Sequence, residues 1–161
     1  MNERVLERRM LLRGAGVAGA TLVGVAAVPA AAQAHDHHGD SGVLGSWLVT
    51  HADAPPGDTT PVLAVISFAA GGVFSSLDLA PASPGGLGAW SSSGDSVTAT
   101  FYIGAPAEGP KQPAVVIKVV ATAMVQGDRV SGTYKLTVYN AKTKKRLTSG
   151  HGTFSGNRIR T

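Results

Sequence analysis

The chain has 161 residues, no cysteine and a formal net charge of +4, and its length falls in the range of one ordinary domain. Only 15% of the residues are charged, 43% are hydrophobic, and the chain contains 21 glycines and 9 prolines. This composition argues against a coiled coil, a bundle of long helices or a charge-rich disordered chain. The lack of cysteine excludes a disulfide scaffold, thiolate metal sites and a cysteine nucleophile.

The first 34 residues have the pattern of an export signal. The pair Arg8 and Arg9 precedes an uncharged segment rich in glycine and alanine, and Ala32–Ala34 is a small-x-small site of the kind that signal peptidases cut. A pair of arginines before so mildly apolar a segment resembles the twin-arginine signal, whose cargo crosses the membrane folded. We therefore expect residues 1–34 to be removed and the protein to be secreted or kept in the cell envelope. The alternative is an uncleaved membrane anchor.

Removal of the signal changes the charge of the protein. The signal takes away four arginines and two glutamates and leaves a mature chain with a net charge of +2. The basic character of the whole sequence is thus no indication of nucleic-acid binding, and we expect neither a nucleic-acid partner nor membrane association after cleavage. The one dense basic stretch, Lys142–Arg146, has the pattern of a solvated hairpin tip, with an anionic surface partner as the alternative.

Residues 35–43 form a short polar tail that is rich in histidine and expected to be flexible. His37 is the third residue of the mature chain if cleavage follows Ala34, and His35 is third if cleavage follows Ala32. A free amine, two backbone nitrogens and an imidazole at position three make a square-planar nitrogen set that suits Cu(II) or Ni(II). The tail thus predicts an amino-terminal copper or nickel site at His35 or His37. The alternative is a merely solubilising tail, with no resident cofactor and only adventitious metal.

From residue 44 onward the chain reads as consecutive β-strands. The apolar runs are short and β-branched, turn residues separate them, and no stretch has helical periodicity over three turns. From Val97 to Ile103 and from Val130 to Val138, every second residue belongs to one apolar or small face, as a sheet with one buried face requires. Eight strands are expected, at Leu44–His51, Val62–Phe68, Val73–Leu79, Leu87–Ser92, Val97–Ile103, Ala114–Val125, Val130–Tyr139 and Arg146–Phe154.

Eight sequential antiparallel strands with short turns close most economically into an up-and-down barrel, because closure removes the unpaired strand edges. We therefore predict that residues 44–161 form a single all-β domain, an eight-stranded antiparallel barrel. A two-sheet β-sandwich is the alternative.

The opening of the first predicted strand resembles that of a known superfamily. Gly45-Ser46-Trp47 is similar to the G-x-W with which lipocalins and related calycin barrels begin. The resemblance implies a calycin-like barrel in which Trp47 fills the closed base. It also implies that a basic residue near the last strand, Arg158 or Arg160, covers the tryptophan ring, an arrangement that cation–π attraction favours.

The body of the chain, over residues 43–159, also resembles small exported bacterial barrels of uncharacterised function, and it is similar in size to allene-oxide-cyclase-like barrels. The pieces that carry this resemblance are Ile66–Phe68, Gly71–Gly72, Gly86–Trp90, Gly132–Tyr134 and Ser149–Phe154. Barrels of the cyclase-like kind shape a reactive hydrophobic substrate inside the lumen.

No catalytic motif stands out in the sequence. Asp78 ends a predicted strand and is a weak candidate for a general base at a barrel mouth, because nothing in the sequence pairs with it. His51 and His151 read as ordinary polar positions that approach each other only if the first and last strands bring them together. The candidate ligand-binding residues are the aromatic and small residues expected to face inward, namely Trp90, Ala99, Phe101, Tyr134 and Leu136.

The expected function is that of an exported, non-enzymatic binding protein that holds a small hydrophobic molecule inside the barrel. Two alternatives stay open at this point. One is a cyclase or isomerase that uses the lumen to fold a reactive substrate, and the other is a surface-interaction protein that binds through its outer face.

Overall fold

The computed structural model describes residues 42–80, 83–107, 109 and 112–160, so the predicted signal, His35 and His37 lie outside the described residues. No described segment forms a helix that is long and apolar enough to cross a membrane. The eight strands are β1 (Gly45–Asp53), β2 (Val62–Ala69), β3 (Val73–Asp78), β4 (Gly86–Ser93), β5 (Ser96–Ala105), β6 (Val115–Gln126), β7 (Arg129–Asn140) and β8 (Arg146–Arg158).

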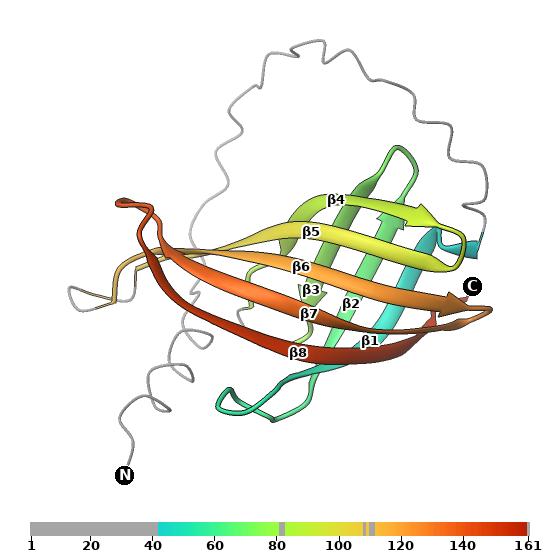
Figure 1. The fold of residues 1–161 in the computed structure, drawn as a ribbon, viewed down its shortest axis with the longest axis horizontal. Coiled ribbons are helices and arrows are strands. Elements are labelled where there is room, and N and C mark those ends of the chain that lie inside the picture. Colours follow the sequence, from blue (N-terminus) through green and yellow to red (C-terminus); the bar gives the residue numbers. More distant parts are fainter. Residues whose placement is uncertain (1–41, 81–82, 108, 110–111, 161) are drawn as a thin grey trace.

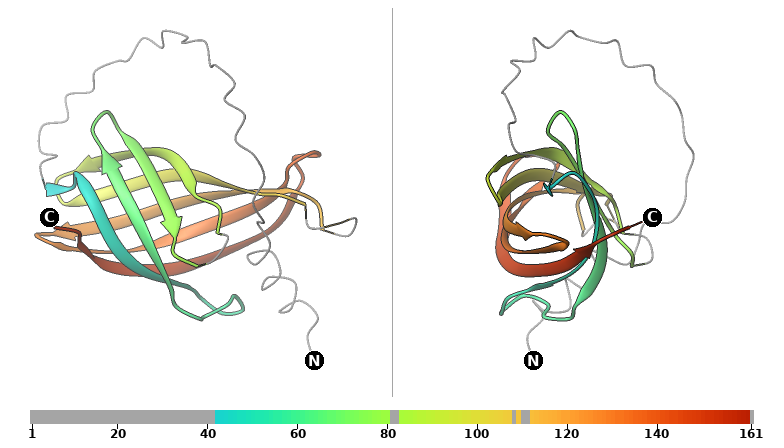
Figure 2. Two further views of the ribbon diagram at one scale, coloured as in Figure 1. Left: turned by 180° about the vertical axis from the view of Figure 1, so that it is seen from behind. Right: turned by 90° about the vertical axis from the view of Figure 1, so that its right-hand side faces the viewer.

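The strands form one closed antiparallel barrel in chain order (Figure 1). Each strand pairs with the next, and β1 pairs with β8, so that Val49 lies opposite Gly156 and Trp47 opposite Arg158. The end-on view in Figure 2 shows the strands closing into a ring. The predicted eight-stranded up-and-down barrel is therefore confirmed, and the alternative β-sandwich is wrong, because a sandwich would leave β1 and β8 unpaired.

The two ends of the barrel differ. The tight turns β2–β3, β4–β5 and β6–β7 lie at one end with the start of β1, and we call this end the base. The connections β1–β2, β3–β4, β5–β6 and β7–β8 lie at the other end, which we call the mouth. Because β6, β7 and β8 have 12, 12 and 13 residues and β3 has only 6, the β5–β6 and β7–β8 hairpins extend past the shorter strands at the mouth (Figure 1).

The strand alternation that the sequence predicts separates the core from the surface. In β5, Val97, Ala99 and Phe101 are buried, whereas the neighbouring Thr98 and Tyr102 are exposed. Inward-facing side chains from all the strands meet inside the barrel, and the ring centroids of an aromatic group pack 4.8–5.4 Å apart. This group consists of Phe68, Phe74, Trp90 and Phe101.

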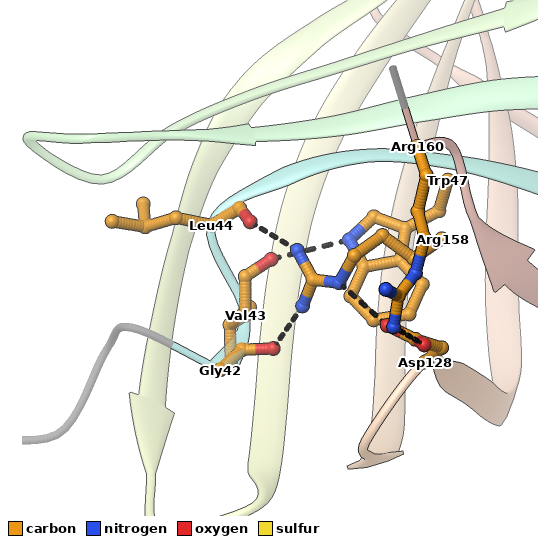
Figure 3. A network of polar contacts seen from close by, with 7 residues as sticks. All are labelled: Gly42, Val43, Leu44, Trp47, Asp128, Arg158 and Arg160. Carbon is orange, nitrogen blue, oxygen red and sulfur yellow. Dashed lines mark hydrogen bonds and ion pairs between the residues drawn. The ribbon is translucent and has the colours of Figure 1, made fainter.

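The base is closed by a tryptophan under an arginine (Figure 3). Trp47 is fully buried and its Nε1 donates to the Val43 carbonyl at 3.1 Å. The guanidinium carbon of Arg158 lies 4.2 Å from the centroid of the Trp47 ring. The same guanidinium donates to the carbonyls of Gly42 and Leu44 and lies 3.4 Å from a carboxylate oxygen of Asp128. One planar cation thus joins the start of β1, the β6–β7 turn and the end of β8.

Two residues assigned to the flexible tail from the sequence belong to this base instead. Val43 is only 2% exposed and packs in the core, and the Gly42 carbonyl accepts a hydrogen bond from Arg158. The ordered barrel therefore begins before Leu44. Of the two predicted covering residues, Arg158 lies over the ring, whereas Arg160 is exposed and pairs with Asp128.

Glycines on the inner face of β8 allow neighbouring strands to approach closely. A Cβ added at Gly156 would lie 2.2 Å from the Leu48 carbonyl oxygen and 2.6 Å from the Val49 Cα, both of which are backbone atoms. Gly104 in β5 is the opposite case, because a Cβ there would meet nothing within 4 Å.

We therefore expect Gly156→Ala to lower the free energy of unfolding by about 1–3 kcal/mol, since the β1–β8 backbone must move to accept the methyl group. Gly104→Ala is the matched control and should leave stability unchanged or raise it by up to about 1 kcal/mol. Urea unfolding of both variants measures the difference. Equal stability of the two variants would contradict the close approach at the β1–β8 seam.

Candidate functional site: an apolar lumen with a polar mouth

The barrel encloses a cavity of about 230 Å³. Its walls are mainly aliphatic and aromatic. Most of its polar residues come from the mouth ends of β1 and β3 and from the β1–β2 connection, and Tyr134 comes from the middle of β7. A volume slightly below the usual range for small-molecule sites suits a compact ligand rather than a long lipid. The apolar wall includes Val49, Ala64, Ile66, Phe68, Phe74, Val97, Ala99, Phe101, Ile103, Ile117, Val119, Ala121, Ala123, Leu136 and Phe154.

Four of the five candidate ligand-binding residues line this cavity, namely Ala99, Phe101, Tyr134 and Leu136. The strand register brings Ala99 and Tyr134 close together, because Ala121 of β6 pairs with Ala99 of β5 on one side and with Tyr134 of β7 on the other. The small Ala99 and Ala121 side chains leave room in front of the Tyr134 ring.

Trp90 has a different place. It is not among the lining residues, because it lies near the base, where its Nε1 donates to the Ala69 carbonyl at 2.9 Å. Its ring meets that of Phe68 nearly edge-on, with a centroid separation of 5.4 Å and an angle of 75°. Trp90 therefore faces inward, as expected, but it fills the barrel near the base instead of lining the cavity.

A histidine of β1 and an aspartate of β3 form a hydrogen bond at the mouth, on the inner side of the barrel. Nε2 of His51 in β1 lies 3.1 Å from Oδ1 of Asp78 in β3, a hydrogen bond in which the imidazole donates to the carboxylate. The Ser83 hydroxyl in the β3–β4 connection donates to the other oxygen of Asp78 at 3.3 Å. Both His51 and Asp78 line the cavity, and both are partly accessible to solvent. The pair is thus fixed in place and still within reach of a bound molecule.

Tyr134 places a hydroxyl beside this pair. The hydroxyl donates to Oδ1 of Asp53 at 2.7 Å, and the imidazole of His51 meets the Tyr134 ring edge-on, with centroids 6.0 Å apart. Burial raises the pKa of the Tyr134 phenol well above its ordinary value, and so do the hydrogen bond to Asp53 and the negative charges of Asp53 and Asp78. The phenol is therefore a neutral hydrogen-bonding group over the whole physiological pH range.

Because the pKa of Tyr134 is raised in the folded chain, the free energy of unfolding should fall as the pH becomes alkaline. The unfolded chain loses the phenolic proton near the ordinary value of about 10, whereas the folded chain keeps it to higher pH. The stabilisation is therefore complete below the unfolded pKa and is lost as pH rises above it. We expect Tyr134→Phe to flatten the alkaline fall in stability, measured by urea unfolding at a series of alkaline pH values. An alkaline fall of the same steepness in Tyr134→Phe would contradict this assignment.

The pairing of His51 with Asp78 was not predicted from the sequence. The available signal for His51 was the alternation of side chains along a strand. Because Trp47 faces inward, a period of two places His51 and Asp53 on the inner face as well. The sequence left open whether the first and last strands bring His51 and His151 together, and the strand register does not pair them. His51 lies opposite Phe154 in the β1–β8 register, whereas His151 is exposed and lies opposite Lys135.

Among the described residues, no group of three or more histidine, cysteine, aspartate or glutamate side chains is arranged to hold a metal ion. The amino-terminal copper or nickel site predicted at His35 or His37 lies outside these residues and stays a prediction.

Comparison of the chain with family models, with curated proteins and with solved structures finds no match.

Proposed function

We propose that this chain is an exported, calycin-like binding protein that holds one small, largely apolar molecule in its barrel. The observation that carries the proposal is the cavity of about 230 Å³, which has an apolar wall and a small set of polar groups gathered at one end. This combination is typical of small-molecule sites, in which apolar contacts supply affinity and a few polar groups fix orientation. Export by the twin-arginine-like signal at residues 1–34 is part of the same proposal.

Closure of the base supports a ligand that enters from the other end. Trp47 and Arg158 block the base, while the partly exposed His51 and Asp78 lie on the cavity wall at the mouth. A ligand would therefore place its apolar body against Phe74, Phe101 and their neighbours, and its polar end toward the mouth.

Native mass spectrometry of the protein purified from its own export pathway tests the proposal. We expect a retained organic molecule in one-to-one ratio, or, for bare protein, saturable binding of compact apolar compounds measured by calorimetry. Bare protein that binds no member of a broad panel of such compounds would overturn the proposal. The same spectrum gives the mass of the mature chain and so tests cleavage near residue 34.

One observation favours a second function, a lumen-based cyclase or isomerase. The hydrogen-bonded pair of His51 and Asp78 lies on the cavity wall beside the Tyr134 ring, and an imidazole oriented by a carboxylate is a common general base. Incubation of the retained molecule, or its biosynthetic precursor, with fresh protein separates the two functions. Recovery of an unchanged compound supports binding alone, whereas conversion that is lost in His51→Ala supports catalysis.

A further inference from the structure

The β7–β8 hairpin has a tip that is rich in cations and extends past the shorter strands at the mouth (Figure 1). Its exposed cations are Lys142, Lys144, Lys145 and Arg146. They are four of the ten lysines and arginines that remain after removal of residues 1–34, so the rest of that chain has a net charge of −2. The positive charge of the mature protein is therefore concentrated at this tip.

The backbone of the tip is held in one shape by Asn140. The side-chain oxygen of Asn140 accepts the backbone N–H groups of Lys142 and Thr143 at 3.0 and 2.9 Å. Its backbone carbonyl accepts the N–H of Lys144, and its own N–H donates to the Lys145 carbonyl, both at 2.9 Å. Because the backbone is already ordered, less conformational entropy is lost when a partner binds the lysine side chains.

The basic surface continues from the tip along the outer face of β6 and β7. The Arg146 guanidinium donates to the Ser149 hydroxyl at 2.7 Å, Ser149 pairs across the strands with Thr137, and Thr137 pairs with Lys118. Lys135 precedes Thr137 by two residues and is thus the diagonal neighbour of Lys118. Both lysines alternate with residues that line the cavity, so they face outward. We call the six cations the basic strip: Lys118, Lys135, Lys142, Lys144, Lys145 and Arg146.

No carboxylate of the described residues lies on the basic strip. Asp95 and Asp128 belong to turns at the base, where Asp128 is paired with Arg158 and Arg160, and the other three described aspartates line the cavity. Within the described part of the chain, none of the six cations forms a salt bridge. The strip is therefore an unneutralised positive surface, which an anionic partner would complement.

The length of the basic strip and its neighbours indicate the kind of anion. The six cations follow a hairpin tip and two strands, so one small anion could not contact both the tip and Lys135, whereas an extended polymer could. Hydroxyl side chains occupy most of the other outer positions and can hydrogen-bond to anionic oxygens or to sugar hydroxyls. These residues are Thr122, Ser131, Thr133, Thr137, Ser149, Thr153 and Ser155.

The same surface lacks the features that two other anionic partners need. The described outer positions of β6, β7 and β8 include no exposed aromatic ring on which nucleic-acid bases could stack. Beside the cations of the tip, Leu147 is a single exposed large hydrophobic residue, which is too little apolar surface for insertion into a lipid interface.

We propose that the basic strip binds a linear anionic polymer of sugars or polyols. Its repeating carboxylate or phosphate groups would pair with the lysines and Arg146, and its hydroxyl groups would bond to the serines and threonines. This surface lies outside the barrel and goes beyond the proposed function, because it does not depend on what the lumen holds.

Calorimetric titration of the protein with polygalacturonate, poly(glycerol phosphate) and neutral dextran tests the proposal. We expect both anionic polymers to bind and dextran not to bind. Affinity should fall at least about tenfold between about 50 and 200 mM salt, because salt screens exposed charges. The polymer that binds more tightly shows whether carboxylate or phosphate is the preferred anion. Binding of dextran with equal affinity, or tighter binding of single-stranded DNA or of anionic lipid vesicles than of both polymers, would overturn the proposal.

Charge-removing variants locate the site. The combined variant Lys142→Gln, Lys144→Gln and Lys145→Gln should bind the tighter polymer at least about tenfold more weakly, because three exposed ion pairs are lost. Arginine at the same three positions keeps the charge and should hold affinity within about threefold of the natural chain. Unchanged affinity in the glutamine variant would overturn the proposal.

Lys135→Gln tests whether the site reaches beyond the tip, and it should weaken binding at least about twofold. Arg160→Gln is its matched control, because Arg160 is an exposed cation at the base and its removal changes the net charge equally. The control should bind the polymer as the natural chain does. An equal loss in Lys135→Gln and Arg160→Gln would mean that only net charge matters and would contradict a site on the basic strip.

Discussion

Replacing Trp47 by alanine is expected to lower the free energy of unfolding by about 3–5 kcal/mol, a large share of the stability of a single domain. Trp47 is fully buried, its Nε1 hydrogen bond holds Val43, and its ring supports the guanidinium of Arg158. Alanine would leave a cavity at the base and take away the surface on which Arg158 stacks. Urea unfolding followed by circular dichroism measures the loss.

The matched control is Leu87→Ala, because Leu87 is the most exposed large hydrophobic side chain among the described residues, with 69% of its surface accessible. That change should alter stability by less than about 0.5 kcal/mol. A double-mutant cycle between Trp47→Ala and Arg158→Ala should give a coupling of about 0.5–2 kcal/mol from the stacked pair. If Trp47→Ala unfolds at the same urea concentration as Leu87→Ala, the tryptophan does not close the base.

Replacing Ala121 by phenylalanine is expected to abolish ligand binding while the barrel stays folded. Ala121 lines the cavity between Ala99 and Tyr134, so an added ring would occupy the space that a ligand needs. We expect affinity to fall by at least about a hundredfold, which corresponds to about 2.8 kcal/mol. The cost in stability should stay within about 1–3 kcal/mol, because the ring enters space that is already empty.

Val120→Phe is the control for this experiment. Val120 is the preceding residue of the same strand, but it faces outward and is 38% exposed. The control should bind ligand with unchanged affinity. If both variants bind as the natural chain does, the ligand site is not the lumen, and if only Val120→Phe loses binding, the outer face carries the function.

The strands could be predicted from the sequence because the information is local. Alternation over seven residues and flanking turn residues give a strand at Val97–Ile103, and the structure has it at Ser96–Ala105. The order of the strands in the barrel followed as well, since each short turn leaves the next strand no other neighbour. The packing of Gly42 and Val43 into the base was missed, because a polar tail gives no local sign of the arginine that holds it.

The site was harder to predict because it depends on contacts between distant residues. His51 and Asp78 are 27 residues apart, and Asp53 and Tyr134 are 81 apart, so only the register of several strand pairs brings them together. The alternation of inward and outward side chains along the strand was enough to predict that Trp90 faces inward. It did not tell how deep Trp90 lies along the barrel axis, which decides whether an inward side chain fills the base or lines the cavity.

The proposed function requires that the ligand lies in the lumen and not on the outer face of the barrel. The most direct test is a solution NMR titration of methyl-labelled protein with octan-1-ol. We predict that the inward methyl groups of Val49, Ala99 and Ala121 shift, while the outward methyl groups of Leu87 and Val120 do not. Shifts confined to the outward methyl groups would contradict the claim and place the interaction on the surface of the barrel.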